Sequence, residues 1–457
     1  MKTLLKFVST TVAVIFTLSV ATDAQARKRA KTVKAADFFA NCISGTREGN
    51  YSQLVIVTHD THVVGDATIG DCAVNVMPGV TLDYSRGELE AGFLRMNGAH
   101  LSSLQILDTE LTTESFSVAG FENIQFSKSD ATGWSIGLDA TGVKTLLRVD
   151  KSNLMAEHLI LINAFGTKTS ETAVQKTHGF VEGVPCCTNR QREILDAMHH
   201  DIGKRVHIDR TQGAGGKILV TSVGINESVT KVQKTTLYGR TEGEDTTQLT
   251  DSVWDDLVNK KSLDDAIAFD WRKYGHVVVH NGSPHDATMM VEMSEIGNGQ
   301  YTTAAINLAA ETSNSLVSKT IFTGTNAVVV DGGVEESVAK VMKNTFLGCE
   351  NTVVRSFSDH DSTLRFRDND VKATDPDVSV TIATAKSGGN SVADFYKNDF
   401  WNSSLIFLGA NGGDDAEADF TKNVFKKVDH VRLFSTGSFY EAKNKFGGAT
   451  PEMNYPD

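Results

Sequence analysis

The sequence repeats one four-residue unit in its last third: Lys343-Asn344-Thr345-Phe346, Asp368-Asn369-Asp370-Val371, Lys397-Asn398-Asp399-Phe400 and Lys422-Asn423-Val424-Phe425. The asparagines are 25, 29 and 25 residues apart, and Lys319-Thr320-Ile321-Phe322 fits one period earlier with threonine in place of asparagine. A period of this length predicts a solenoid, in which each unit is buried by its neighbours.

Alternating apolar residues lie five and three positions before each asparagine. The pairs are Ala339 and Val341, Leu364 and Phe366, Ala393 and Phe395, and Ala418 and Phe420. This alternation predicts a strand with one buried face. The residue directly before each asparagine is charged although the alternation would bury it, so the chain must turn there. We expect the asparagine itself to make the turn, because it tolerates the left-handed conformation better than most residues.

A third apolar run follows in each unit. These runs are 328–330, 353–354, Val378/Val380/Ile382, 405–408 and Val431/Leu433. Three short strands and three corners in about 25 residues describe one coil of a parallel β-helix, whose strands stack about 4.8 Å apart.

The strand–asparagine–corner–strand unit resembles that of the right-handed parallel β-helix superfamily, which includes pectate lyases, pectinases, phage tailspikes and many bacterial surface proteins. In that superfamily the asparagines stack into a ladder. The resemblance is clear over residues 315–435 and weaker over 55–165. It implies an all-β fold, a right-handed parallel β-helix solenoid. The strings typical of pectate lyases, pectinases, pectin methylesterases and alginate-lyase β-helices are not found, so no enzyme family is implied.

Six regions are predicted along the chain. They are a signal peptide (1–26), a segment with an N-terminal cap helix (27–54), irregular coils (55–165), coils with inserted helical loops or a side domain (166–300), regular coils (301–436) and a C-terminal tail or cap (437–457). The cap helix is predicted because Phe38, Phe39, Cys42 and Ile43 share one helical face.

Export is predicted from the first residues. Lys2 and Lys6 precede an apolar run over 7–21, and Ala24-Gln25-Ala26 offers small residues to a signal peptidase. The run is shorter than the ~20 residues that span a bilayer, and no second run is long enough. We therefore expect a mature chain without a membrane span, in the periplasm, at the cell surface or in the medium.

Two segments in the middle have helical spacing of apolar residues. Residues 189–206 carry Ile194, Leu195, Met198 and Ile202; residues 251–274 carry Trp254, Leu257, Val258, Leu263, Ile267 and Trp271. These patterns predict helices inserted between coils, and insertions on one face of a solenoid often build its binding site.

The net charge of −13 disfavours nucleic acid and anionic membranes as partners. It also disfavours a broad groove for polyanionic sugars, unless bound cations or a local basic patch reverse the field. The corner lysines Lys319, Lys343, Lys397 and Lys422 have two interpretations: solvated turn residues, or a basic stripe for an anionic sugar.

Five cysteines leave at least one unpaired in an exported chain. Cys42 and Cys72 could pair across the N-terminal region, and Cys186 and Cys187 are adjacent. Cys349 lies inside the repeat and is expected to be a buried small apolar residue. The connectivity stays open.

The superfamily resemblance places ligands along the sheet formed by the third apolar run. On that pattern Arg355 and Arg432 face outward, with Thr381 and Phe407 between them as binding residues. The loop after Arg355 carries Asp359, His360 and Asp361, which complete a catalytic group with Arg355. Asp331, Asp359, Asp361, Asp414 and Asp415 are the candidate metal ligands.

Such a cluster is what a calcium-assisted polysaccharide lyase needs. The Ca²⁺ neutralises the carboxylate of a uronate, and a basic side chain removes the neighbouring proton. The alternative is that exposed loops of an acidic protein are rich in aspartate. Two functions therefore stay open: an exported protein that binds a polysaccharide or cell-surface glycan, and that cleaves it if the cluster is catalytic, or a non-catalytic surface, adhesive or scaffold solenoid.

Overall fold

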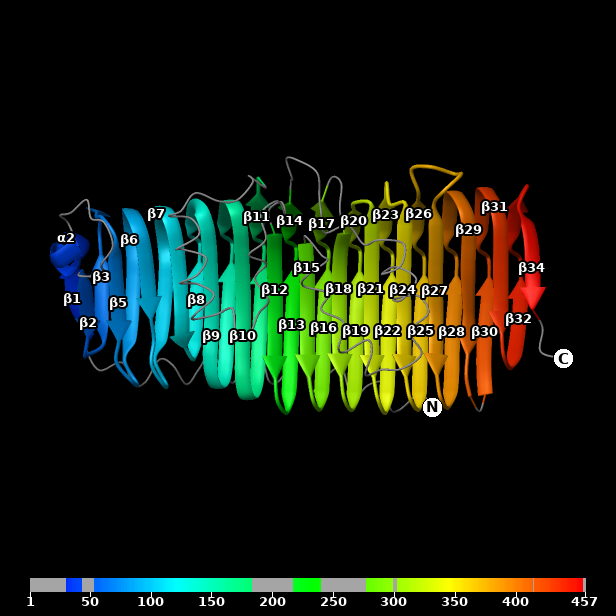
Figure 1. Ribbon diagram of the computed structural model, residues 1–457, viewed down its shortest axis with the longest axis horizontal. Helices are drawn as coiled ribbons and strands as arrows, with labels where there is room; N and C mark the ends of the chain where they lie inside the picture. The colour runs from blue at the N-terminus through cyan, green and yellow to red at the C-terminus, as the bar shows by residue number, and fades with distance from the viewer. Residues whose placement is uncertain are drawn as a thin grey trace.

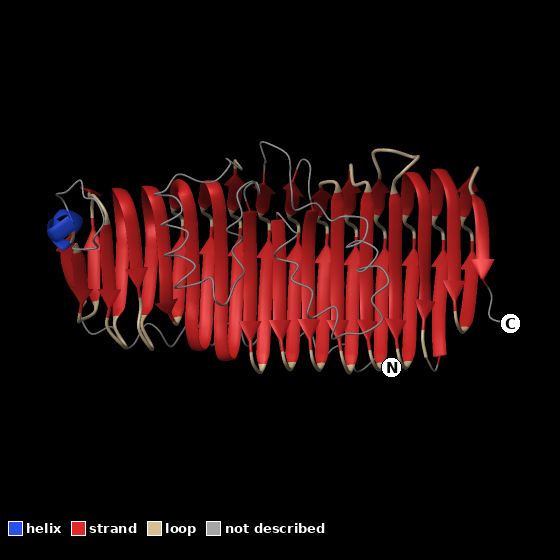
Figure 2. Ribbon diagram, viewed as in Figure 1, coloured by secondary structure: helices blue, strands red, loops and turns tan. Residues whose placement is uncertain are grey.

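The computed structural model of the protein is an elongated solenoid built from three parallel sheets. Its coils follow one another along the long axis (Figures 1 and 2). The structure describes residues 30–42, 53–182, 217–239, 277–298, 302–413 and 415–454. The chain winds through about 12 turns, and each strand pairs in parallel with its counterpart in the next turn. The predicted all-β parallel β-helix is confirmed.

The first sheet contains the third apolar run of each unit. Its strands are β2 (Leu54–Val57), β5 (Cys72–Val76), the ends of β6 (Thr81–Asn97) and β7 (Ser103–Phe121), the middle of β9 (Asp130–Asp150) and β10 (Asn153–Gln175), β12 (Lys217–Gly224), β15 (Val277–Ser283), β18 (Thr302–Ala309), β21 (Asn326–Gly333), β24 (Asn351–Ser358), β27 (Val380–Ser387), the ends of β29 (Asp399–Asn411) and β31 (Val424–Ser435), and β34 (Thr450–Asn454).

The second sheet contains the alternating strand that precedes each corner. Its strands are β1 (Lys31–Lys34), β3 (Thr61–Val64), β8 (Asn123–Ser127), β13 (Glu227–Gln233), β16 (Asp286–Glu292), β19 (Thr312–Ser318), β22 (Glu336–Met342), β25 (Asp361–Arg367), β28 (Asn390–Tyr396), β30 (Asp415–Thr421) and β32 (Ser438–Ala442), with the starts of β6 and β7 and the ends of β9 and β10.

The third sheet contains the short strand after each corner. Its strands are β4 (Ala67–Thr68), β11 (His178–Val181), β14 (Thr236–Gly239), β17 (Glu295–Asn298), β20 (Ile321–Thr323), β23 (Thr345–Leu347), β26 (Asp370–Lys372) and β33 (Lys445–Gly447), with the middle of β6 and β7 and the starts of β9, β10, β29 and β31. Each regular coil passes through the second, third and first sheets in that order.

The corner between the second and third sheets uses a different residue from the one expected. The positive backbone φ belongs to the residue before each asparagine, with 60° at Lys343, 55° at Asp368 and 62° at Lys422. The asparagine turns inward instead and is buried, so that Asn344 and Asn369 lie one above the other. The predicted asparagine ladder is present, but its role is hydrogen bonding rather than the left-handed turn.

Stacked aromatic side chains fill much of the interior of the C-terminal half. The rings of Phe322 and Phe346 are 5.2 Å apart, and those of Phe400 and Phe425 are also 5.2 Å apart, nearly parallel. Full burial of one such side chain stabilises the fold by roughly 1.5–3 kcal/mol. The periodic phenylalanines therefore hold successive coils together.

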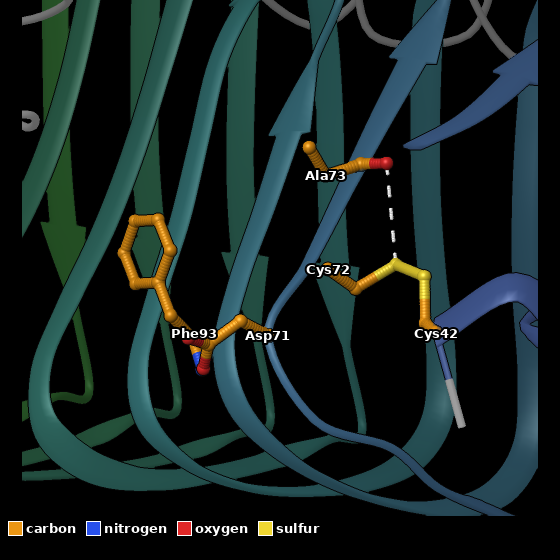
Figure 3. The surroundings of a disulfide bond; sticks show 5 residues. All are labelled: Cys42, Asp71, Cys72, Ala73 and Phe93. Carbon is orange, nitrogen blue, oxygen red and sulfur yellow. Dashed lines mark hydrogen bonds between the residues drawn. A yellow bond between two sulfur atoms is a disulfide. The ribbon is translucent and has the colours of Figure 1, made fainter. Parts of the chain in front are cut away.

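A short helical segment covers the N-terminal end, with α2 (Ala35–Phe38) followed by the 3₁₀ turn η1 (Ala40–Cys42). Phe39 is buried with its ring edge toward Tyr84, and a disulfide joins Cys42 to Cys72 on β5 (Figure 3). The predicted cap helix is present but only four residues long. Cys349 is a buried free thiol, as expected.

The coils continue through the region where insertions were predicted. Strands β11 to β17 stack in register on their neighbours. Residues 183–216 join β11 to β12 and residues 240–276 join β14 to β15, and both segments lie outside the described residues, as do the predicted helical stretches and the signal peptide. In the part of the chain that is described, no helix has the length and apolar character needed to span a bilayer.

Candidate functional site

The predicted ligand-binding column on the first sheet is not assembled as expected. Thr381 points inward and is buried. Its partners in register on the two neighbouring strands, Thr352 and Ile406, also point inward. The expectation took Val380 and Ile382 as inward. A shift of one residue reverses the face of every side chain in a strand, so Ile382 faces outward instead.

Arg355 faces outward but stands in another column. Its neighbours in register are Val330 and Thr384, whereas Phe407 and Arg432 follow Ile382. Burial lowers the pKa of Arg355 to about 10. The guanidinium is therefore charged at neutral pH and is not a solvent-exposed proton acceptor.

Phe407 and Arg432 already have partners of their own. The ring of Phe407 stacks on Phe434 at 4.5 Å. The exposed Arg432 forms an ion pair with Glu452, with an Nη2–Oε2 distance of 2.9 Å. Neither residue contacts Arg355 through these interactions.

Asp331 was expected in an exposed loop but is fully buried inside the solenoid. Its carboxylate accepts hydrogen bonds from Ser313 at 2.9 Å, from Ser337 at 2.8 Å, from Asn307 at 2.8 Å and from Ser315. Burial raises the pKa of Asp331, although these four donors oppose the shift. Asp331 lies near the end of β21, points into the interior of the solenoid and cannot reach a ligand outside.

Asp359, His360 and Asp361 lie on the exposed turn that leads into β25. Asp361 accepts a hydrogen bond from Asn390 at 3.0 Å, and in the next coil Asp415 stands beside Asn390. Asp361 and Asp415 are thus separated by a complete rung, and Asp414 lies outside the described residues. No group of three or more His, Cys, Asp or Glu side chains suited to a metal ion occurs among the described residues. Calcium binding here stays a prediction.

A second feature extends along the whole described solenoid, at the corner between the second and third sheets. From β6 onward each described coil places one residue with positive φ, between 50° and 62°, on the exposed outside of this corner. We call these positions the lysine row. They are Arg86, Asp108, Lys128, Lys151, Lys176, Lys234, Met293, Lys319, Lys343, Asp368, Lys397, Lys422 and Lys443.

Backbone hydrogen bonds keep the lysine row in file. The N–H of Lys151 donates to the carbonyl of Gln175, directly before Lys176, at 2.9 Å. The N–H of Lys176 donates to the carbonyl of Gln233, directly before Lys234, also at 2.9 Å. One lysine therefore follows another at the strand spacing of about 4.8 Å, even where 58 residues separate Lys176 from Lys234 in the sequence.

The backbone geometry does not by itself explain why these residues are lysines. Glycine, asparagine and aspartate tolerate a positive φ best. Nine of the thirteen positions nevertheless carry lysine and one carries arginine, in a chain with a net charge of −13. The row is a local basic patch on an acidic protein.

Aromatic side chains lie beside the lysine row on the outside of the third sheet. Phe180 and Tyr238, four residues after Lys176 and Lys234, stack with parallel rings 6.1 Å apart. Trp401, four residues after Lys397, lies under the ammonium group of Lys426 at 4.2 Å. This face therefore combines flat apolar surfaces with positive charge.

Tyr396, on the other side of the corner, contacts two members of the row. The ammonium groups of Lys397 and Lys422 lie 5.0 and 4.9 Å from its ring centre, and Lys422 donates a hydrogen bond to its hydroxyl at 2.9 Å. This bond is the main reason why the pKa of Tyr396 is lowered. The row is thus linked to aromatic rings on both sides.

Acidic residues interrupt the positive field in places. Asp108 and Asp368 occupy two positions of the row. Asp130, Glu295, Asp370 and Asp399 stand in the first outward column of the third sheet. Lys151, Lys176 and Lys234 have Asn153, His178 and Thr236 at those positions instead. The three rungs beside Phe180 and Tyr238 are therefore the strongest candidate site.

The repeated asparagine unit of the sequence reveals only the part of the row from Lys319 to Lys422. The earlier rungs have serine or threonine in place of the inward asparagine, as in Lys128-Ser129, Lys151-Ser152, Lys176-Thr177 and Lys234-Thr235. A search for lysine followed by any small polar residue would have extended the row to the earlier coils.

The chain matches no protein-family model, and comparisons with curated proteins and with solved structures find no significant match.

Proposed function

We propose that this protein works outside the cytoplasm and binds an acidic polysaccharide along the lysine row. The observation that carries the proposal is the file of nine exposed lysines, one on nearly every rung from Lys128 to Lys443. Carboxylate or sulfate groups at regular intervals along an extended glycan are the natural counterpart of such a file.

The spacing favours a linear polymer over a small anion. Rungs about 4.8 Å apart are comparable to the length of one sugar residue along an extended chain. A single exposed ammonium–carboxylate pair contributes only ~0–1 kcal/mol. Several pairs on one chain act together, because binding of the first raises the effective concentration for the rest.

The aromatic residues of the third sheet add a contact that suits sugars. Phe180, Tyr238 and Trp401 present ring faces next to the lysines. Aromatic faces pack well against apolar surface and carry a negative quadrupole, and the C–H faces of sugar rings are of this apolar kind. The proposal therefore assigns charge recognition to the row and stacking to the third sheet.

A polysaccharide fits this face better than a nucleic acid does. The lysines form a single file rather than a broad patch, and Glu295, Asp370 and Asp399 lie beside them. Double-stranded DNA has one charge per ~1.7 Å of axis and recruits dense clusters of Lys and Arg. The net charge of −13 opposes such a partner over most of the surface.

Cleavage is not part of this proposal. Arg355, a member of the expected catalytic group, is half-buried and protonated at neutral pH, and Asp331 lies inside the solenoid. A lyase activity that depends on calcium at Asp359 and Asp361 is a separate prediction. It is tested by incubating the same glycans with and without Ca²⁺ and measuring new unsaturated ends.

The test compares two matched triple variants of the full chain. Lys151→Gln, Lys176→Gln and Lys234→Gln remove three consecutive charges of the row, and Lys31→Gln, Lys34→Gln and Lys168→Gln remove three exposed charges elsewhere. Binding to polygalacturonate, alginate, hyaluronan, neutral dextran and single-stranded DNA is measured by biolayer interferometry.

We expect the row variant to lose about tenfold in affinity for at least one acidic glycan, since three pairs of ~0.5 kcal/mol sum to the ~1.4 kcal/mol that a tenfold change requires. The control variant should bind like the unmodified chain. Equal losses in both variants would contradict the proposal, as would preferential binding of dextran or DNA or no binding at all.

A further inference from the structure

The outside of the second sheet is bordered by opposite charges. Where its strands end, the chain turns through the lysine row. Where they begin, the first residue of each strand and the two residues before it carry carboxylates from β13 to β30. We call these residues the acidic edge: Glu227, Asp286, Glu311, Glu335, Glu336, Asp359, Asp361 and Asp415. Glu311 is half-buried beside His285, and the other seven are exposed.

Strand pairing keeps both edges in file along the solenoid. Glu227 pairs in register with Asp286, and Glu336 pairs with Asp361. The described residues of the acidic edge include no lysine or arginine. On each rung the member of the lysine row comes seven residues after the first residue of the strand. At about 3.3 Å per residue the two edges lie roughly 23 Å apart, so the opposite charges of one rung cannot reach each other.

The middle of this surface has the composition of an interface centre. Its outward positions include partly exposed apolar side chains on five successive strands: Val229, Met290, Leu316, Val338 and Val392. The charged side chains there are of both signs, including Lys340, Arg365, Asp394 and Asp419. A less charged centre inside a polar rim is typical of protein–protein contacts.

We propose that this face of the second sheet binds the same face of a second copy of the chain, about a two-fold axis parallel to the long axis of the solenoid. Rotation about that axis turns the two faces toward each other and reverses the direction of the strands. The acidic edge of each copy therefore meets the lysine row of the other.

The charges match rung by rung in this arrangement. Glu227 of one copy faces Lys234 of the other, because both lie on the rung of β13. Glu336 faces Lys343 on the rung of β22 in the same way. On the rung of β30 Asp415 faces Lys422. Each pairing occurs twice, because a two-fold axis makes the contact reciprocal.

The charges also select the orientation of the two copies. A two-fold axis along the strands would bring the faces together as well, but it would place acidic edge on acidic edge. Such like-charge contacts disfavour a partner by several kcal/mol. One rung opposes the parallel arrangement, since Asp361 faces Asp368 there. The long axes of the two copies therefore run in the same direction.

The complementary face begins at β13. On the two preceding coils the corresponding edge carries Lys144 and Lys168, which would face Lys151 and Lys176. The proposed contact therefore leaves Lys151 and Lys176 outside. The inference does not rest on glycan binding, which needs neither the acidic edge nor a second copy.

The size of the face suits a specific dimer. It spans seven strands from β13 to β30, or about 29 Å at the strand spacing, and is roughly 23 Å wide. Two such faces bury about 1,300 Å² together, within the ~1,200–2,000 Å² of stable interfaces. The net charge of −13 repels the copies at a distance, but physiological salt screens charges beyond ~8 Å.

The test reverses the charges of each edge separately, in the full chain. The acidic-edge variant carries Glu227→Lys, Glu336→Lys and Asp415→Lys. The row variant carries Lys234→Glu, Lys343→Glu and Lys422→Glu. A control reverses three exposed carboxylates on the third sheet, with Glu88→Lys, Glu90→Lys and Glu110→Lys. Sedimentation velocity over a range of protein concentrations measures the dimer dissociation constant.

We expect the unmodified chain and the control to form dimers, and each edge variant to raise the dissociation constant tenfold or more. An equal mixture of the two edge variants should recover a dimer of one copy of each, because their reversed edges are again complementary. That recovery would also show that both variants are folded. The proposal is overturned if the unmodified chain is monomeric at every concentration, if neither edge variant weakens the dimer, or if the mixture does not recover it.

A second measurement uses the unmodified chain. A carbodiimide joins a carboxylate to an amine in direct contact, and Glu336 and Lys343 of one copy are about 23 Å apart along the strand. An amide between them must therefore join two copies. A mixture of unlabelled and isotope-labelled chains should yield hybrid cross-linked peptides for Glu336 with Lys343 and for Asp415 with Lys422. Links of Glu336 only to lysines on distant rungs, or no link between copies, would contradict the parallel arrangement.

Discussion

Asn369 donates a hydrogen bond from its side-chain amide to the side-chain oxygen of Asn398 one rung further on, at 3.1 Å, while its backbone N–H reaches the same oxygen at 3.0 Å. Asn398 repeats this arrangement with Asn423, and its amide also donates to the carbonyl of Phe366. The side chains thus satisfy buried backbone groups at a corner where no strand partner exists.

Asn398→Ala should lower the free energy of unfolding by about 2–4 kcal/mol, because it leaves the N–H of Asn369 and the carbonyl of Phe366 buried without partners. Urea denaturation followed by circular dichroism measures the change. The control is Asn390→Ala, whose side chain is exposed. If the two variants lost equal stability, the ladder would not have the role described here.

Asp331→Asn should stabilise the protein at neutral pH, because asparagine removes the cost of holding a charge in the interior. Burial raises the pKa of Asp331 in the folded state above its value in the unfolded chain. Its contribution to stability is then fully present below the unfolded pKa and is lost as the pH rises through the folded pKa.

The advantage of Asp331→Asn should accordingly shrink as the pH is lowered toward 4, the region of an unperturbed aspartate. Denaturation midpoints measured between neutral and acidic pH check this trend. Asp361→Asn, at an exposed position, serves as the control. An advantage independent of pH would mean that Asp331 is not the titrating group.

Loss of the Cys42–Cys72 disulfide should loosen the N-terminal end. The bond closes a loop of 30 residues and ties η1 to β5, and a bond of this kind contributes roughly 2–4 kcal/mol. The double variant Cys42→Ser and Cys72→Ser should show faster hydrogen exchange in β1 to β5. The regular coils from β18 onward, far along the solenoid, should exchange as before (Figure 1). Faster exchange throughout would indicate that the end cap controls the whole fold.

Trp401→Ala should weaken glycan binding by about 1 kcal/mol through lost stacking. The dependence of affinity on salt should change little, because no charge is removed. A salt titration of the dissociation constant separates this effect from that of lysine substitutions. Tyr440→Ala, at an exposed aromatic residue on the second sheet, is the control. A reduced salt slope in Trp401→Ala would contradict the division between charge and stacking.

Local pattern was sufficient to predict the coil. The alternation before each asparagine and the phenylalanine after it, as in Phe366 and Phe346, reflect how side chains alternate across a strand and pack between rungs. Asp331 was expected in a loop, but β21 continues to Gly333 and carries Asp331 inward. The prediction of Thr381 failed for a different reason. In a short apolar run the inward phase is ambiguous by one residue, and only pairing with neighbouring rungs fixes it.

The sequence by itself determined that chain segments about 25 residues apart stack, because burial of periodic apolar residues is a local and repeating requirement. It could not show that Lys176 and Lys234 lie on neighbouring rungs, because 58 residues separate them in the sequence instead of about 25. Nor could it show that Leu219 and Val278, which point away from the interior of the solenoid, are nevertheless buried. Both facts depend on which segments meet in space, and tertiary contact alone decides that.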